Sequence, residues 1–221
     1  QPRLNIVFFL ADDLGQRDLG SYGSTFYETP HLDRLAREGA RFTDAYAACP
    51  VCSPTRASIH TGRWPARTGI TDWIPGDSAK ADVAHRFLHV QDRNELPLEQ
   101  LTVAEILAGA GYQTFFAGKW HLGGDGYLPT NQGFEVNLGG GHYGQPPHGY
   151  FAPWQIPSLP EGVSGEYLTE RLTKESVKFL QHRDRQRPFL LFLSHYDVHT
   201  PIHKAPGHFA DFAERAAGLG V

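Results

Sequence analysis

The sequence predicts an α/β fold whose mostly parallel central sheet is flanked by helices. Short apolar runs alternate along the chain with segments whose apolar residues recur at helical spacing, and this alternation is typical of parallel sheets. The 221 residues contain no internal repeat and no stretch that resembles a linker. We therefore expect a single domain, long enough to bury a substantial core.

The first predicted strand is Leu4–Leu10. Its residues are apolar and β-prone except for Asn5, as expected of a central parallel strand that is buried on both faces. Asp12 and Asp13 follow almost directly. Two carboxylates therefore stand at the carboxyl end of this strand.

The first predicted helix has Thr29 as its N-cap and Pro30 at its first position. Both residue types are typical of these positions, because Thr can accept a backbone hydrogen bond and Pro lacks the donor that the first turn leaves unused. We expect Leu32 and Leu35 to form the buried face and Gly39 to end the helix.

The second helix is marked by Thr102 and Glu105, which have the spacing of a capping box. Gly111 follows its end, and a strand is predicted at 114–117. The residues expected on the buried face are Val103, Ile106 and Leu107.

A third helix is predicted within residues 164–183, because Leu168, Leu172 and Phe179 fall on one helical stripe. The strand predicted after it is Phe189–Leu193. Two long segments rich in Gly, Pro and aromatic residues separate these elements, at residues 62–98 and 123–163. Loops of that length are usually functional surfaces or lids.

Composition excludes some classes of function. The formal net charge is −4 and the Lys and Arg residues are scattered, so we expect no nucleic-acid partner. No apolar run approaches the roughly 20 residues that span a bilayer, so we expect no membrane anchor. The start at Gln1-Pro2 is what a processed, exported protein would show, and we expect a periplasmic or secreted location.

Polar, reactive side chains follow each of the three best strands. Asp12 and Asp13 follow the first strand, Lys119 and His121 the second, and His195 and His199 the third. Ligands of open parallel sheets bind outside the carboxyl ends of the strands. Each of these residues also has an ordinary structural explanation, as a turn, a cap or a loop contact. Paired carboxylates would favour Ca²⁺ or Mg²⁺ over zinc.

Other histidines are weaker candidates. His85 and His89 have the spacing of a helical metal pair but lack the Glu of a metalloprotease motif. His142 and His148 lie in a Gly-rich loop that could line a substrate pocket or face water.

The two cysteines, Cys49 and Cys52, are three positions apart. This spacing is compatible with a redox pair, but a zinc site would need a second pair, which is absent from the sequence. Cys52 directly precedes a predicted helix start, with Ser53 as N-cap and Pro54 at the first position. We therefore expect the chemistry at Cys52 and interpret Cys49 as an ordinary small buried residue.

The segment CSPTRASIHTGR, Cys52–Arg63, closely resembles the signature of the type I sulfatases of the alkaline phosphatase superfamily. The resemblance implies that a maturation enzyme converts Cys52 to Cα-formylglycine, whose hydrate is the nucleophile. It also implies that this enzyme reads Pro54 and Arg56. In that case Cys52 does not act as a thiol.

The resemblance extends from about Asn5 to Pro201. It implies that Asp12 and Asp13, in ADDLG, are metal ligands for Ca²⁺, with Mg²⁺ the lesser alternative, and that the modified Cys52 completes part of the shell. Relatives supply further calcium ligands and another lysine from a later stretch, and no matching Asp-Asn segment occurs in this sequence.

The other two motifs that carry the resemblance are GKWHLG and VHTP. They imply that Lys119 contacts a sulfate oxygen, that His121 bonds the formylglycine hydrate, and that His199 serves the sulfate ester or leaving-group oxygen. Arg56 and Lys119 would offset the charge of the sulfate as the sulfur is attacked.

The resemblance thus implies that residues 1–221 are the N-terminal part of a sulfatase catalytic domain. We expect a sulfuric ester hydrolase that acts on a sulfated carbohydrate or an aryl sulfate. A phosphomonoester or phosphonate hydrolase of the same superfamily and an inert fragment that only binds ligand remain alternatives, and a reversible Cys49–Cys52 disulfide is a third.

Overall fold

The computed structural model describes residues 3–75, 92–204 and 207–220. Its core is a four-stranded sheet in the order β1-β4-β2-β3, in which every neighbouring pair is parallel. The strands are β1 (Ile6–Leu10), β2 (Gln113–Gly118), β3 (Val136–Leu138) and β4 (Phe189–Ser194). The predicted α/β class with a parallel sheet is confirmed.

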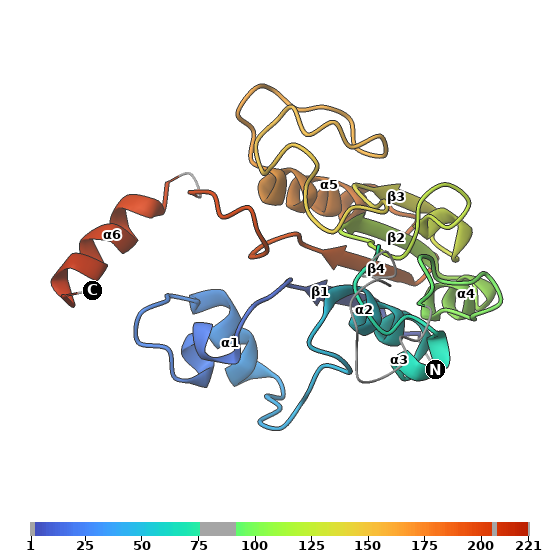
Figure 1. Ribbon diagram of the computed structural model, residues 1–221, viewed down its shortest axis with the longest axis horizontal. Coiled ribbons are helices and arrows are strands. Elements are labelled where there is room, and N and C mark those ends of the chain that lie inside the picture. Colours follow the sequence, from blue (N-terminus) through green and yellow to red (C-terminus); the bar gives the residue numbers. More distant parts are fainter. Residues whose placement is uncertain (1–2, 76–91, 205–206, 221) are drawn as a thin grey trace, which may run out of the picture.

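Helices cover both faces of the sheet (Figure 1). Helix α5 (Leu168–His182) lies on one face, and α2 (Cys52–Thr61) and α4 (Val103–Gly109) lie on the other. Because side chains alternate along a strand, Phe115 and Leu191 pack toward α5, while Phe116 and Phe192 pack toward α2 and α4. The result is a three-layer arrangement.

The prediction that the first strand is central and buried on both faces is wrong. Within the described residues β1 is an edge strand and begins at Ile6. Its burial alternates, and Val7 and Phe9 are 57% and 55% exposed. The continuous apolar run could not reveal this, because the extent of burial depends on which elements cover each face.

Helix α1 (Pro30–Glu38) begins and ends as predicted, with Gly39 after its last residue. Its predicted buried face is wrong, since Leu32 and Leu35 are both exposed. Thr29 does not cap the helix by accepting a bond from the first turn. Its hydroxyl instead donates to Asp33, at 3.0 Å.

The capping box that opens α4 is confirmed. Glu105 donates its backbone N–H to the Thr102 hydroxyl at 3.2 Å, and the Glu105 carboxylate accepts from the Thr102 N–H at 2.7 Å. The predicted buried face is only partly right, because Ala104 is fully buried whereas Ile106 is exposed. Strand β2 follows at the predicted position, one residue longer at each end.

Helix α5 and strand β4 are confirmed with their predicted stripe, since Leu168 and Leu172 are fully buried and Phe179 packs against the same core. The loop predicted at 123–163 contains the short strand β3. A strand of three residues is too short to be predicted from its sequence pattern. The same loop also contains a 3-10 helix, Pro129–Asn131. Helix α3 (Pro65–Thr68) lies in the other long segment.

Two further regions lie beside the sheet. Short 3-10 helices, Gln16–Asp18 and Gly20–Tyr22, precede α1, and helix α6 (Phe209–Gly218) lies on the same side of the molecule (Figure 1). Phe212 of α6 packs near Phe26, with ring centroids 5.7 Å apart. None of the helices in the described ranges is long and apolar enough to cross a membrane. The candidate metal pair His85 and His89 lies outside the described residues.

Candidate active site

Cys52 is the first residue of α2, at the end of the helix that faces the sheet's carboxyl edge. The predicted helix start is two residues late, because Val51 and not Ser53 is the N-cap. The Ser53 hydroxyl does not cap the helix. It accepts a hydrogen bond from the Ile74 backbone N–H, at 3.0 Å, and so attaches the loop after α3 to the start of α2.

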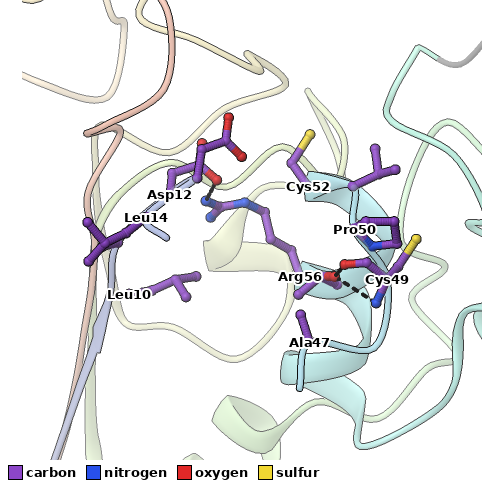
Figure 2. Close-up of a pocket in the computed structure, with 12 residues that line it drawn as sticks. Leu10, Asp12, Leu14, Ala47, Cys49, Pro50, Cys52 and Arg56 are labelled. Carbon is purple, nitrogen blue, oxygen red and sulfur yellow. Dashed lines mark hydrogen bonds and ion pairs between the residues drawn. The ribbon is translucent and has the colours of Figure 1, made fainter. Parts of the chain in front are cut away.

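Arg56 lies one helical turn after Cys52 and is almost fully buried. Its guanidinium donates to Asp12 at 3.0 Å, to the Lys119 carbonyl at 2.7 Å and to the Ser194 hydroxyl at 2.7 Å. Figure 2 shows its side chain reaching from α2 to Asp12, with Cys52 beside it. This single side chain therefore connects α2 with the ends of β1, β2 and β4.

Lys119 shares the same carboxylate and is fully buried. Its ammonium bonds one oxygen of Asp12 while Arg56 bonds the other. Burial raises the pKa of Asp12, but the charges of Arg56 and Lys119 outweigh this effect, so the pKa lies below its usual value. Burial and the charge of Arg56 lower the pKa of Lys119, against the opposing effect of Asp12. With Lys119 protonated, two buried cations face one buried anion, and the cluster has an excess of positive charge.

The neighbouring carboxylate of Asp13 has a different environment. Its backbone is in the left-handed region, at φ 57°, and the side chain is 63% exposed. The nearest basic group is the Nε2 atom of His199, at 3.8 Å. The Nδ1 atom of His199 is 2.8 Å from the Thr200 carbonyl, so Nδ1 carries a proton and Nε2 faces Asp13.

His121 is buried and its backbone is also left-handed, at φ 57°. Burial lowers its pKa to about 4, so the ring is neutral at pH 7. The Nε2 atom contacts the Ile74 carbonyl and must carry the proton of the neutral ring. The Nδ1 atom is then an acceptor, and it has no partner among the described residues.

Two cavities meet at Cys52. The first, which we call the polar cavity, has a volume of about 410 Å³ and is lined by Asp12, Arg56 and Cys49 among others. The second, the aromatic cavity, has a volume of about 530 Å³. Both are lined by Asp13, Pro50, Val51 and Cys52. Cys52 therefore lies where the two cavities meet.

Besides Cys52, three predicted site residues and one weaker candidate line the aromatic cavity. They are Asp13, His121, His199 and His142. Lys119 lines neither cavity but lies beneath Asp12. Two other histidines are elsewhere: His195 is buried against Phe9, and His148 is exposed and lines neither cavity.

Cys49 is not the buried residue that was predicted. It is half-buried and lines the polar cavity. Its backbone N–H donates to the Thr55 hydroxyl at 3.1 Å, and its carbonyl accepts from the same hydroxyl. The segment before α2 is thereby folded back onto the helix.

Asp197 is not among the candidates that the sequence indicates, yet its backbone bonds that of Asp12. Its carbonyl accepts from the Asp12 N–H at 2.8 Å, and the Asp12 carbonyl accepts from the Val198 N–H at 2.7 Å. The Asp197 carboxylate accepts hydrogen bonds from the hydroxyls of Tyr167, at 2.5 Å, and Thr169. A polar residue between His195 and His199, just after a buried strand, is the signal that could have identified it.

The residues present offer the type of ligand that calcium prefers, but too few ligands for a complete shell. Carboxylate oxygens are suitable ligands, and Ca²⁺ takes about six to eight oxygens. Asp12 already binds two cationic side chains and Asp13 offers one more carboxylate. Within the described ranges no three or more His, Cys, Asp or Glu side chains form a group that could hold a metal. These residues can supply part of a shell.

The sequence of the chain matches a known family. The sequence pattern of the family described as Sulfatase matches residues 4–217. Arylsulfatase A of Homo sapiens is 48% identical over 138 residues, which are 61% of this chain and 25% of that protein. Arylsulfatase G of Rattus norvegicus is 33% identical over 241 residues, with 93% of this chain and 43% of that protein covered.

Solved structures agree. Ps i-CgsB, in complex with k-i-k-neocarrahexaose, has a TM-score of 0.74 and 29% identity, covering 96% of this chain and 49% of that one. A protein in complex with its substrate D-glucosamine-2-N,6-O-disulfate has a TM-score of 0.74 and 30% identity, covering 96% and 38%. The chain spans less than half the length of these four proteins. With the family pattern matched over almost its whole length, and with the signature cysteine at the meeting point of two cavities, the chain belongs to the sulfatase family.

Proposed function

We propose that the protein is a sulfuric ester hydrolase that removes sulfate from a sulfated carbohydrate or an aryl sulfate. The observation that carries this proposal is the position of Cys52. It opens α2, lines both cavities, and lies one turn from a buried arginine in a cluster with excess positive charge. An anion held at this point is stabilised by the helix N-terminus as well as by Arg56.

The nucleophile in this proposal is Cα-formylglycine at position 52, formed by a maturation enzyme. As a hydrate, this group supplies one hydroxyl to attack sulfur and a second whose deprotonation expels the sulfate and restores the aldehyde. Cys52 is half-buried and at the cavity wall, so the residue is in a position where both maturation and substrate could reach it.

His121 and His199 are suited to the two proton transfers. The neutral His121 ring lines the aromatic cavity, and its buried Nδ1 atom has no partner among the described residues. We propose that this atom takes a proton from a hydroxyl at position 52. His199 lines the aromatic cavity, and its Nε2 atom lies 3.8 Å from an Asp13 carboxylate oxygen. When protonated, it can donate that proton to the leaving-group oxygen as the S–O bond breaks.

Arg56 and Lys119 hold the charge. Their two positive charges exceed the single negative charge of Asp12. The cluster therefore favours a bound sulfate and the negative charge that develops on it. Lys119 acts through Asp12 in this structure, and direct contact with a sulfate oxygen remains a prediction. Asp12, Asp13 and position 52 would supply part of a shell for Ca²⁺, which would add further positive charge at this point. We propose a periplasmic or secreted location on the family likeness.

The test begins with expression of the protein together with a formylglycine-generating enzyme. Mass spectrometry of the tryptic peptide 42–56 should show that Cys52 has been converted, and the matured protein should release sulfate from 4-nitrophenyl sulfate. Cys52→Ala should abolish release, whereas Cys49→Ser should retain it, because only position 52 opens α2.

Two outcomes would contradict the proposal. An unmodified thiol at Cys52 together with no sulfate release would exclude a formylglycine sulfatase. Faster turnover of 4-nitrophenyl phosphate than of the sulfate would favour a phosphomonoesterase, because the site would then match the greater charge of a phosphate ester.

A further inference from the structure

Ser53 directly follows Cys52 on α2, yet its side chain lies outside both cavities. It is fully buried and lines neither the polar nor the aromatic cavity. Its hydroxyl oxygen accepts a hydrogen bond from the Ile74 backbone N–H, at 3.0 Å. Because Ser53 does not reach a ligand in either cavity, any influence of its hydroxyl on the reaction passes through the residues that it holds.

Ile74 connects Ser53 to His121. While its N–H donates to Ser53, its carbonyl contacts the Nε2 atom of His121. These are the two hydrogen bonds that the Ile74 backbone makes to described residues. The Ile74 side chain is also buried, in the same core cluster as Ala57 of α2 and Trp120. Ile74 is therefore held by the core through its side chain and by Ser53 through its backbone.

The His121 ring has little freedom to turn. A Cβ on Gly144 would come within 2.8 Å of the ring carbon Cε1 and 3.0 Å of Nε2, so the Gly144 backbone closes over this edge of the ring. A carbonyl can only accept a hydrogen bond, and the contact with Ile74 therefore requires the proton of the neutral ring on Nε2. Of the two neutral forms, only this one leaves Nδ1 free to accept a proton.

We propose that Ser53 is a positioning residue for His121: by holding Ile74, its hydroxyl keeps the imidazole in the Nε2–H form, with Nδ1 available to the hydroxyl at position 52. This inference rests on the proposed function, in which His121 accepts that proton. The residue next to the nucleophile thus orients the proton acceptor, through two bonds that span 21 and 47 residues of the sequence.

The first experiment observes the tautomer itself. Long-range proton–nitrogen correlation spectra are recorded at pH 7 on protein labelled with ¹⁵N-histidine, before and after maturation, and His121→Gln identifies the His121 signals by their loss. The wild-type ring should show a protonated Nε2 and an unprotonated Nδ1. Ser53→Ala removes one buried oxygen and should fold. It should add a second set of ring signals with a protonated Nδ1, because the Ile74 carbonyl is no longer held against Nε2.

The second experiment measures turnover of 4-nitrophenyl sulfate by matured protein, per mole of formylglycine found by mass spectrometry. Ser53→Ala should lower kcat by about threefold to tenfold, the loss expected for one hydrogen bond. KM should change by less than about twofold, because Ser53 lines neither cavity. Ser53→Thr keeps the hydroxyl and should retain both the wild-type tautomer and kcat.

Ser58 provides a matched control on the same helix. Its hydroxyl oxygen is buried and has no hydrogen-bond partner among the described residues. Ser58→Ala is therefore the same substitution in α2 without the connection to Ile74. It should leave the His121 spectrum and kcat unchanged.

The outcomes separate this inference from the proposed function. An unchanged His121 spectrum in Ser53→Ala would overturn the inference and leave the hydrolase standing. Equal losses of kcat in Ser53→Ala and Ser58→Ala would also overturn it, because they would show a general effect of altering α2. No sulfate release by the matured wild-type protein would overturn the proposed function and the effect on kcat, whereas a changed tautomer in Ser53→Ala alone would still support the positioning of His121.

Discussion

The two cavities that meet at Cys52 are built in opposite ways. The polar cavity rests on Asp12, Arg56 and Lys119, which are buried and bonded to one another at the ends of β1, α2 and β2. The aromatic cavity is formed largely by loops, with half-exposed or exposed side chains such as Trp73 and His142. Both lie within reach of the same residue.

The difference follows from dielectric environment. Buried charges are tolerated only when they are paired, so removing one partner exposes the others to the full cost of desolvation. Apolar rings near the surface make contacts that are individually small. We therefore expect substitutions on the polar side to affect stability and activity together, and substitutions on the aromatic side to affect mainly the choice of substrate.

The largest expected effect is that of Asp12→Ala. It leaves Arg56 and Lys119 buried without their carboxylate, and the free energy of unfolding should fall by about 3–5 kcal/mol. Asp13→Ala is the matched control, since Asp13 is 63% exposed and its loss should change stability by less than about 1 kcal/mol. Urea denaturation measures both, and equal effects would contradict the contrast between the cavities.

A smaller effect is expected for Asp197→Asn. The carboxylate bonds Tyr167 and Thr169 in a half-buried position, and hydrogen bonds to a charged group contribute about 1.5–3 kcal/mol. We expect a loss of stability in that range, together with a lower kcat, because the segment that carries His199 also bonds the backbone of Asp12. Wild-type kcat in a destabilised variant would show that Asp197 does not position the site.

The pH dependence of stability should reflect His60, which is buried on α2. Burial, with the charge of Arg56, lowers its pKa to about 3 from 6.5. The unfolded chain therefore binds a proton that the folded chain does not. Stability should fall as pH decreases from about 6.5 toward 3, by up to about 1.4 kcal/mol per pH unit from this residue.

His60→Phe tests this prediction, because it removes the titrating group and keeps an aromatic ring. The imidazole stacks on Phe192, with the two ring centroids 4.6 Å apart. The variant should show a shallower decrease in stability between pH 6.5 and 4, measured by urea denaturation at several pH values. Some slope should remain, since burial also lowers the pKa of His121 and His195 to about 4. An unchanged slope would contradict the prediction.

The smallest effect is expected on the aromatic side. His142 is exposed, and its ring centroid lies 4.3 Å from that of Tyr143. His142→Ala should therefore change the free energy of unfolding by less than about 0.5 kcal/mol. Thermal unfolding measures this change. A decrease of several degrees in Tm would contradict the prediction and show that His142 stabilises the fold. KM for 4-nitrophenyl sulfate should still rise, because His142 lines the aromatic cavity.

Local signals in the sequence predicted much of the framework. The capping box at Thr102 and Glu105 and the stripe of α5 were found where the residues predicted them, because both depend on neighbours within one or two turns. Burial was predicted less well. Leu35 and Phe9 are exposed, since their burial depends on distant elements that no local pattern describes.

The sequence by itself determined which residue types stand at the strand ends and which cysteine opens a helix, and its signature motif indicated the family. Only the tertiary structure decided which of these charged residues form ion pairs with one another. It placed both Arg56 and Lys119 on Asp12, left Asp13 exposed, and positioned an aromatic cavity beside Cys52. The physical reason is that electrostatic pairing and cavity shape depend on distances between segments, and those distances exist only after the sheet has assembled.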